Sequence, residues 1–159
     1  VGGAIFHDGN LLPGDAFRCG EAGHMTLIPD GKPCYCGKTG CVDAYCSARL
    51  LSDLSGGRLE DFFLGLQQNN PDYRSVWDTY LKHLAVVINN LHILLDYDIV
   101  LGGYVGSFLT PWLDTIRRLV AEHNTFEDDG SFVKLCTYQT GAAAYGAAMD
   151  VMEEFLRTV

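Results

Sequence analysis

One short stretch of the chain holds four side chains of the kinds that bind transition metals: His24, Cys34, Cys36 and Cys41. A structural zinc site is closed by four soft or borderline ligands, and three thiolates with one imidazole form a common set. Two glycines between the last two cysteines allow the tight backbone path that three converging thiolates require. The residue types and their spacing therefore predict one zinc site with these four ligands.

Three other interpretations of these cysteines stay open. The six cysteines of the chain form an even count, which allows disulfides. However, no secretory signal is visible, and Cys-x-Cys pairs rarely reach disulfide geometry. The thiols could also be unligated core groups, or ligands of an iron–sulfur cluster, although their spacing does not match the usual ligand runs. We favour zinc, and we interpret Cys19, Cys46 and Cys136 as ordinary small buried residues.

The composition excludes several classes of function for this chain. It has 159 residues, 48% of them hydrophobic, and a net charge of −9. Such a charge repels DNA, so the chain alone is not expected to bind nucleic acid. No apolar run approaches the roughly 20 residues that cross a bilayer. These features predict a cytoplasmic protein with no membrane partner, in which residues 1–159 form a single domain.

The metal ligands lie among short strands and one helix. Two apolar stretches, 4–6 and 11–12, flank an Asp-Gly dipeptide, which is a strong signal for a β-hairpin. Residues 25–28 are expected to form a third strand between His24 and the cysteines. A helix over 42–54 should follow directly after Cys41 and end at Ser55-Gly56-Gly57.

The rest of the chain alternates between helices and strands. Apolar residues at three-and-four spacing indicate one buried face on a long helix over 72–95. The residues of that face are Val76, Tyr80, Leu84, Val87, Ile88, Leu91 and Leu95, and we expect them in the core rather than at an interface. The other expected elements are helices over 59–66, 109–122 and 141–156 and strands over 98–101 and 132–136. This order predicts an α/β fold with a mixed sheet, antiparallel where the hairpin leads and parallel later, flanked by helices.

The metal-ligand segment resembles the signature of the ROK family, named for repressors, open reading frames and kinases. The signature joins Gly20-Glu21-Ala22-Gly23-His24 to Cys34-Tyr35-Cys36-Gly37-Lys38-Thr39-Gly40-Cys41, with an acidic residue, here Asp43, two places later. Two further stretches, 1–5 and 99–103, look like phosphate-loop and nucleotide-side segments of the family. The resemblance implies an actin-like, ribonuclease-H-like lobe, and more narrowly the C-terminal sugar-binding lobe of a longer protein.

The resemblance also implies roles for individual residues. Glu21 matches the carboxylate that accepts hydrogen bonds from sugar hydroxyls. His24 matches the residue that both ligates zinc and contacts the sugar. Two glycine pairs, Gly2-Gly3 and Gly102-Gly103, match nucleotide-binding segments, although short glycine pairs more often serve turns.

No catalytic residue is expected in this chain. The catalytic aspartate of the family's kinases and their first phosphate loop belong to the upstream lobe. The aspartates that precede or closely follow the cysteines (Asp8, Asp15, Asp30 and Asp43) do not match that motif. The chain alone is therefore not expected to phosphorylate a substrate.

Two functions compete for the parent protein. The stretch 30–47, and Ala4 in place of a usual glycine, look more like the NagC/XylR-like transcriptional regulators of the family. On that basis we predict a sugar-sensing, zinc-containing lobe of a regulator, which reaches DNA only through an absent upstream domain. The alternative is the C-terminal lobe of a glucokinase or N-acetylhexosamine kinase, which would use ATP and Mg²⁺. A zinc-bearing interaction module without a sugar site is a third interpretation. The expected partners are a sugar or sugar phosphate and a second copy of the chain in a homodimer.

Overall fold

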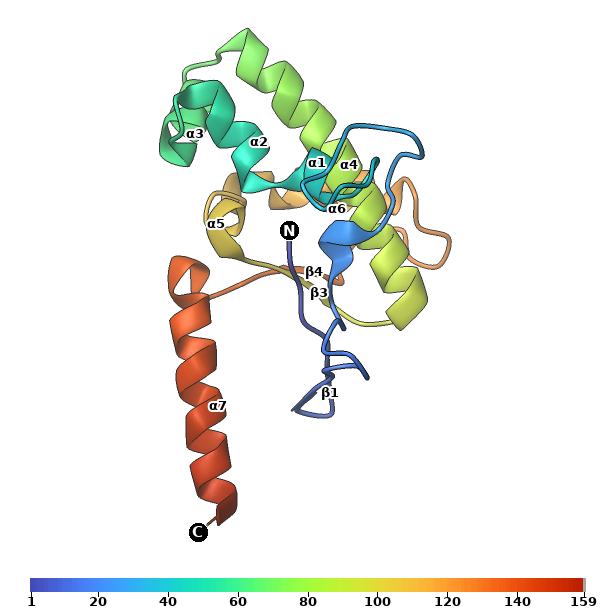
Figure 1. The fold of residues 1–159 in the computed structure, drawn as a ribbon. Coiled ribbons are helices and arrows are strands. Elements are labelled where there is room, and N and C mark those ends of the chain that lie inside the picture. Colours follow the sequence, from blue (N-terminus) through green and yellow to red (C-terminus); the bar gives the residue numbers. More distant parts are fainter. Residues whose placement is uncertain (159) are drawn as a thin grey trace. The chain divides into compact units, whose positions relative to one another are not determined.

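The computed structural model describes residues 1–158, apart from the side chains of residues 153 and 154. The chain divides into two compact units, the first formed by Val1–Val87 and the second beginning at Ile88 (Figure 1). The predicted α/β class is confirmed, because helices combine with one antiparallel and one parallel strand pair. Each pair forms its own two-stranded sheet within the described residues. The prediction of a single domain over 1–159 stays a prediction.

The first unit opens with the predicted hairpin. Strand β1 (Phe6–His7) pairs antiparallel with β2 (Asn10–Leu11). The two turn residues, Asp8 and Gly9, have φ values of 49° and 74°. A two-residue turn whose central residues both have positive φ matches the right-handed twist of the strands, which explains why Asp-Gly stands here.

The prediction of a third strand over 25–28 is wrong. The described structure has only an isolated bridge there, between Thr26 and Cys41. A short 3₁₀ helix, η1 (Ala22–His24), precedes it. Backbone hydrogen bonds of this segment instead go to the cysteine loop, since the amides of Leu27 and Ile28 both donate to the carbonyl of Gly40. The backbone amides that a continuous strand would have paired with another strand are therefore used in hydrogen bonds to the cysteine loop.

The helix predicted over 42–54 is interrupted. The structure contains α1 (Asp43–Cys46), α2 (Ala48–Ser52) and the 3₁₀ helix η2 (Asp53–Ser55). Ser47 separates α1 from α2 in an extended conformation, and its hydroxyl accepts a hydrogen bond from the amide of Leu50. Serine competes well for such a capping role because its short side chain satisfies an amide that the first helical turn leaves without a partner.

The core of the first unit is built around aromatic side chains. Helix α3 (Leu59–Gln67) lies with α2 beside the N-terminal half of α4 (Pro71–Leu95) (Figure 1). Phe62 is fully buried, stacks on Tyr73 and meets Phe63 edge to face. Trp77 is also fully buried, and its ring stacks on that of Tyr80.

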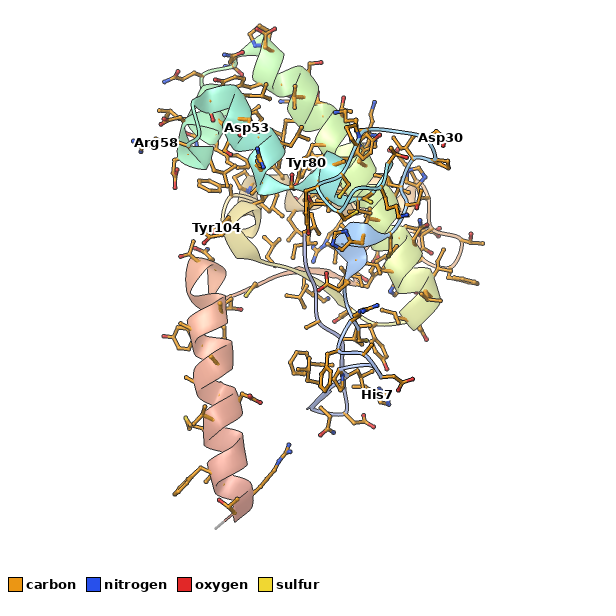
Figure 2. All side chains as sticks on the ribbon, viewed as in Figure 1. His7, Asp30, Asp53, Arg58, Tyr80 and Tyr104 are labelled. Atoms are coloured by element: carbon orange, nitrogen blue, oxygen red, sulfur yellow. The ribbon has the colours of Figure 1, made fainter. Side chains whose placement is uncertain are left out.

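Tyr80, labelled in Figure 2, connects this aromatic core to the segment that follows the cysteines. Its buried hydroxyl donates to the carbonyl of Cys46 at 2.8 Å. Burial raises the pKa of this phenol far above its ordinary value, so it stays a neutral donor. A buried tyrosine normally finds such a partner for its hydroxyl.

The buried face of α4 is displaced from the predicted one. Tyr80, Val87 and Ile88 are buried as expected, but Val76 and Leu84 are only half-buried. The fully packed positions include Trp77, Leu81, Ala85 and His92, which the apolar pattern did not select. The size of Trp77 explains why the buried face of α4 is displaced. Burying its indole removes more apolar surface from water than burying the side chain of Val76 would.

The second unit contains the parallel strand pair. Strand β3 (Ile99–Leu101) pairs with β4 (Val133–Leu135), with Ile99 opposite Val133 and Leu101 opposite Leu135. The helix predicted over 109–122 consists of the 3₁₀ turn η3 (Thr110–Trp112) and α6 (Leu113–Ala121). A four-residue helix, α5 (Gly103–Gly106), follows β3.

His92 is a buried polar side chain of the second unit. Its ring stacks on Phe132 with 3.5 Å between the centroids. Nδ1 lies 2.8 Å from the carbonyl oxygen of Tyr97, and Nε2 lies 3.3 Å from a carboxylate oxygen of Glu127. Both ring nitrogens therefore have a polar neighbour, as a buried imidazole requires.

The chain ends in η4 (Gln139–Gly141) and α7 (Ala142–Thr158). Most of the described part of α7 is exposed. Its exposed large apolar side chains are Tyr145, Met149, Val151, Met152, Phe155 and Leu156. Among residues 1–158 no helix combines the length and apolarity needed to span a membrane.

We expect Phe62→Ala to lower the free energy of unfolding by about 3–5 kcal/mol, because it removes a fully buried ring and leaves a cavity. Leu64→Ala is the matched control on the same helix, since Leu64 is 51% exposed, and it should cost less than about 1 kcal/mol. Urea unfolding followed by tryptophan fluorescence measures both values. Equal losses for the two variants would contradict the assigned core.

Candidate metal centre

The structure brings together the four predicted metal ligands. The ligand atoms of His24, Cys34, Cys36 and Cys41 all lie within 4.8 Å of one another. The sulfur atoms of Cys36 and Cys41 are 3.7 Å apart, and all six cysteines are free thiols. A disulfide needs sulfurs about 2.05 Å apart. Zinc–sulfur bonds of about 2.3 Å in a tetrahedron place two sulfurs roughly 3.8 Å apart, which fits the observed distance.

Backbone hydrogen bonds of the cysteine loop produce this convergence. The amide of Cys34 donates to the carbonyl of Lys38, and the amide of Gly37 donates to that of Cys34. These bonds close a tight turn, in which Gly37 has a φ of 85° that glycine adopts without strain. The turn holds Cys34 and Cys36 on either side of Tyr35 and brings both close to Cys41.

A second set of backbone hydrogen bonds holds the segment after His24 against the cysteine loop. The amide of Val42 donates to the carbonyl of Met25, next to the bridge between Thr26 and Cys41. Gly40, at a φ of 79°, packs so closely on the backbone of Ile28 that a Cβ would collide with it. Glycine is therefore required at this position by both conformation and space.

The pKa values of two thiols of the cluster, Cys36 and Cys41, are shifted in opposite directions. Hydrogen bonding, first from the backbone of Lys38 and then from Cys34, lowers the pKa of the Cys36 thiol. Loss of hydration, together with the neighbouring thiols, raises the pKa of Cys41. Thiols this close together resist simultaneous ionisation because their negative charges repel. A bound divalent cation removes that repulsion, since thiolates are the form that ligates metals.

Glu21, the predicted sugar ligand, stands beside the cluster in sequence and structure. It directly precedes η1, which ends at His24, and it is exposed. The glycines on either side of it, Gly20 and Gly23, pack against the backbone of Gly3 and Val1, and a Cβ on either would collide there. The first three residues of the chain therefore lie along the Gly20–His24 motif.

Tyr35 is a site residue to which the sequence analysis assigned no role. Its hydroxyl lies 3.1 Å from Nε2 of His24, and the two rings meet edge to face with centroids 5.3 Å apart. Loss of hydration, followed by the charges of Asp43 and of further groups that include Glu21, raises the pKa of this phenol. The sequence signal for this residue was its position between two of the predicted metal ligands.

The predicted nucleotide-binding glycines fall in both units. Gly2 and Gly3 belong to the first unit, and Gly102 and Gly103 belong to the second, where they follow the carboxyl end of β3. Gly102 faces Cys136, which follows β4, and a Cβ on Gly102 would lie 3.2 Å from that of Cys136. Gly103 has a φ of 71°. The structure thus describes each pair within its own unit.

Comparison with known sequences gives two informative relatives. The chain is 53% identical to a glucokinase of Halalkalibacterium halodurans over 183 residues, covering 97% of this chain and 54% of that protein. It is 29% identical to an N-acetylmannosamine kinase of Salmonella typhi over 157 residues, covering 94% of this chain and 52% of that protein. The chain therefore spans about half the length of these curated relatives.

Solved structures confirm the fold. A ROK family glucokinase from Streptomyces griseus, in complex with glucose and AMPPNP, matches 89% of this chain and 54% of its own with a TM-score of 0.72 at 22% identity. A ROK family transcriptional regulator, a homolog of the E. coli MLC protein, matches 84% of this chain and 38% of its own with a TM-score of 0.67 at 23% identity. The model of the ROK family itself matches residues 1–154. This chain therefore belongs to the ROK family, as its glycine, histidine and cysteine signature predicted.

Proposed function

We propose that this chain is the zinc-bearing, sugar-binding part of a sugar kinase of the ROK family, with a glucose-like or N-acetylhexosamine substrate. The observation that carries the proposal is the 53% identity to a glucokinase over nearly the whole chain. A second relative is an N-acetylmannosamine kinase. Because the chain spans about half of each relative, the phosphoryl transfer belongs to the longer parent protein and this chain supplies one part of its site.

Zinc is the metal that the donor set favours. Three thiolates and one imidazole suit zinc, whereas magnesium and calcium prefer oxygen ligands. The distance of 3.7 Å between two of the sulfurs fits tetrahedral coordination. Four protein ligands also close the coordination sphere, which is typical of a structural rather than a catalytic zinc. The role we assign to the metal is to fix the loop, and no chemical step passes through it.

The sugar is proposed to bind on the side of the cluster that carries Glu21. A carboxylate accepts hydrogen bonds from two adjacent hydroxyl groups, which is the pattern that a pyranose presents. Glu21 is exposed and stands three residues before the ligand His24, so a fixed metal loop also fixes this carboxylate. Support from the metal-bound loop would keep the Glu21 carboxylate oriented before the sugar binds.

The nucleotide is proposed to use the glycine loop after β3. Open α/β sheets bind ligands beyond the carboxyl ends of their parallel strands, and Gly102-Gly103 lies at such an end. Without a Cβ, these residues allow phosphate groups to approach the backbone closely. ATP with Mg²⁺ would supply the phosphoryl group in the parent protein. Gly2 and Gly3 remain a second, independent proposal for phosphate contact.

A transcriptional regulator, our first interpretation of the sequence, is not favoured over a kinase. The match to a ROK regulator lies at 23% identity and supports the common fold alone. Both of the sequence relatives described above are kinases. Binding of DNA through another domain, a homodimer and a cytoplasmic location remain predictions about the parent protein.

Cys36→Ser is expected to abolish stoichiometric zinc binding and to lower the free energy of unfolding by several kcal/mol, because structural zinc contributes its binding energy directly to folding. Metal analysis of the purified chain and its thermal unfolding measure the two effects. Cys19→Ser is the control, since Cys19 lies outside the cluster. Unchanged zinc content and melting temperature in Cys36→Ser would count against the site.

Glu21→Gln in the intact parent protein is expected to reduce kcat/KM for the sugar roughly 10- to 100-fold, because it replaces a charged acceptor by a neutral amide of the same shape. ATP consumption with glucose and with N-acetylmannosamine measures the activity. Glu60→Gln, at an exposed position of α3, should leave the activity unchanged. If the wild-type parent consumes no ATP with either sugar, the kinase proposal is wrong for these substrates.

A further inference from the structure

The three thiols of the cluster differ in how far solvent reaches them. Cys36 is exposed, whereas Cys34 and Cys41 are buried, with 9% and 2% of their surfaces exposed. The reaction of a cysteine with an oxidant in solution increases with the exposure of its side chain. Within the cluster, Cys36 is therefore the residue that a small oxidant meets first.

Cys41 supplies a second sulfur within reach of Cys36. Their Sγ atoms are 3.7 Å apart, and a disulfide requires about 2.05 Å. The chain next to Cys36 has room to move, because a Cβ on Gly37 would have no atom within 4 Å. On the other side, Gly40 packs closely on the backbone of Ile28 and holds Cys41 in place. The distance can therefore close by movement of the exposed Cys36 toward the fixed Cys41.

Cys34 is a less suitable partner for Cys36. One residue separates these two, and Cys-x-Cys pairs rarely reach disulfide geometry. Four residues separate Cys36 from Cys41, and two of them, Gly37 and Gly40, have the positive φ values that let the chain turn back. The geometry thus favours one of the three pairings that the cluster contains.

We propose that Cys36 and Cys41 form a redox pair that a hydroperoxide oxidises to a disulfide. In the first step the Cys36 sulfur attacks one oxygen of hydrogen peroxide, the O–O bond breaks, and water and a sulfenic acid result. In the second step the Cys41 sulfur attacks the Cys36 sulfur and displaces the hydroxyl group, which leaves as water. The two metal-bound thiolates give up two electrons, solvent supplies two protons, and one peroxide becomes two waters.

Disulfide formation removes two of the four proposed zinc ligands. His24 and Cys34 alone do not complete a tetrahedral set, so we expect the metal to dissociate. The disulfide closes only the short loop over 36–41, and it leaves the segment with His24 without its tie to the cysteines. Oxidation would thus open the loop that the metal closes, and a thiol reductant with added zinc would close it again.

Oxidation of the intact, zinc-loaded parent protein with stepwise additions of hydrogen peroxide tests the proposal. A chromophoric chelator measures the released zinc, and mass spectrometry of unreduced peptides locates the disulfide. We expect a Cys36–Cys41 linkage that appears together with zinc release, and reversal of both by dithiothreitol and zinc. A linkage through Cys34, retention of zinc in the oxidised protein, or irreversible oxidation of Cys36 without a disulfide would overturn the proposal.

Two variants separate the redox pair from general damage by peroxide. Cys36→His keeps four ligands in a Cys₂His₂ set but removes the exposed sulfur, so zinc release should slow roughly tenfold or more. Cys19→Ser is the control, because Cys19 lies outside the cluster, and it should release zinc as the wild type does. Equal release from Cys36→His and wild type would contradict the role of Cys36. If Cys36→His binds no zinc, the peptide map of the wild type decides.

A consequence for the sugar rests on the proposed function. Because Glu21 stands three residues before His24, an opened loop should no longer orient its carboxylate. Calorimetry should show that the oxidised parent binds glucose or N-acetylmannosamine roughly tenfold or more weakly than the reduced, zinc-loaded parent. Equal binding by both forms would refute this coupling. If neither sugar binds the reduced parent, the proposed function fails, whereas the peptide map and zinc release still decide the redox pair.

Discussion

The arrangement of the first unit depends on holding three thiols and an imidazole at one point. Between β2 and α1 the described chain has only one 3₁₀ turn and two isolated bridges. Such a segment buries few backbone hydrogen bonds in regular ladders and loses much conformational entropy when it is fixed. A metal ligated by His24 and the cysteines, as proposed above, would replace the missing strands, because it would close the loop through four bonds instead of a sheet.

The same constraint reaches the residue proposed to meet the sugar. Glu21 stands at the start of the turn that ends in His24. Its side chain belongs to no helix or strand, so its direction follows from the loop alone. Gly20 and Gly23 add a second constraint, since their lack of a side chain lets the first residues of the chain lie against the motif. The loop of the candidate metal ligands and the proposed sugar-binding residue therefore belong to one structural unit.

The sequence was informative where one local rule decided the structure. Asp8-Gly9 requires positive φ at both turn residues, and the hairpin has it. Prediction failed where distant partners competed with a local preference. Residues 25–28 have the composition of a strand, but their backbone bonds go to Gly40 and Val42 in the cysteine loop. The hydrogen bond between Tyr35 and His24 was also out of reach, because it depends on the turn that brings two separated segments together.

The preference for a regulator came from residues that cannot separate the two functions. The stretch 30–47 builds the cysteine loop and the start of the first helices. The proposed sugar site would use this loop in the same way whether the parent protein senses or phosphorylates the sugar. Ala4 differs from glycine by one methyl group and is exposed, so it restricts phosphate approach little. Chemistry that distinguishes a kinase needs a base at the sugar hydroxyl and a second phosphate contact. The 53% identity to a glucokinase extends over nearly the whole chain and so compares many more positions than the cysteine loop contains. It therefore outweighs the local likeness of that loop to the regulators of the family.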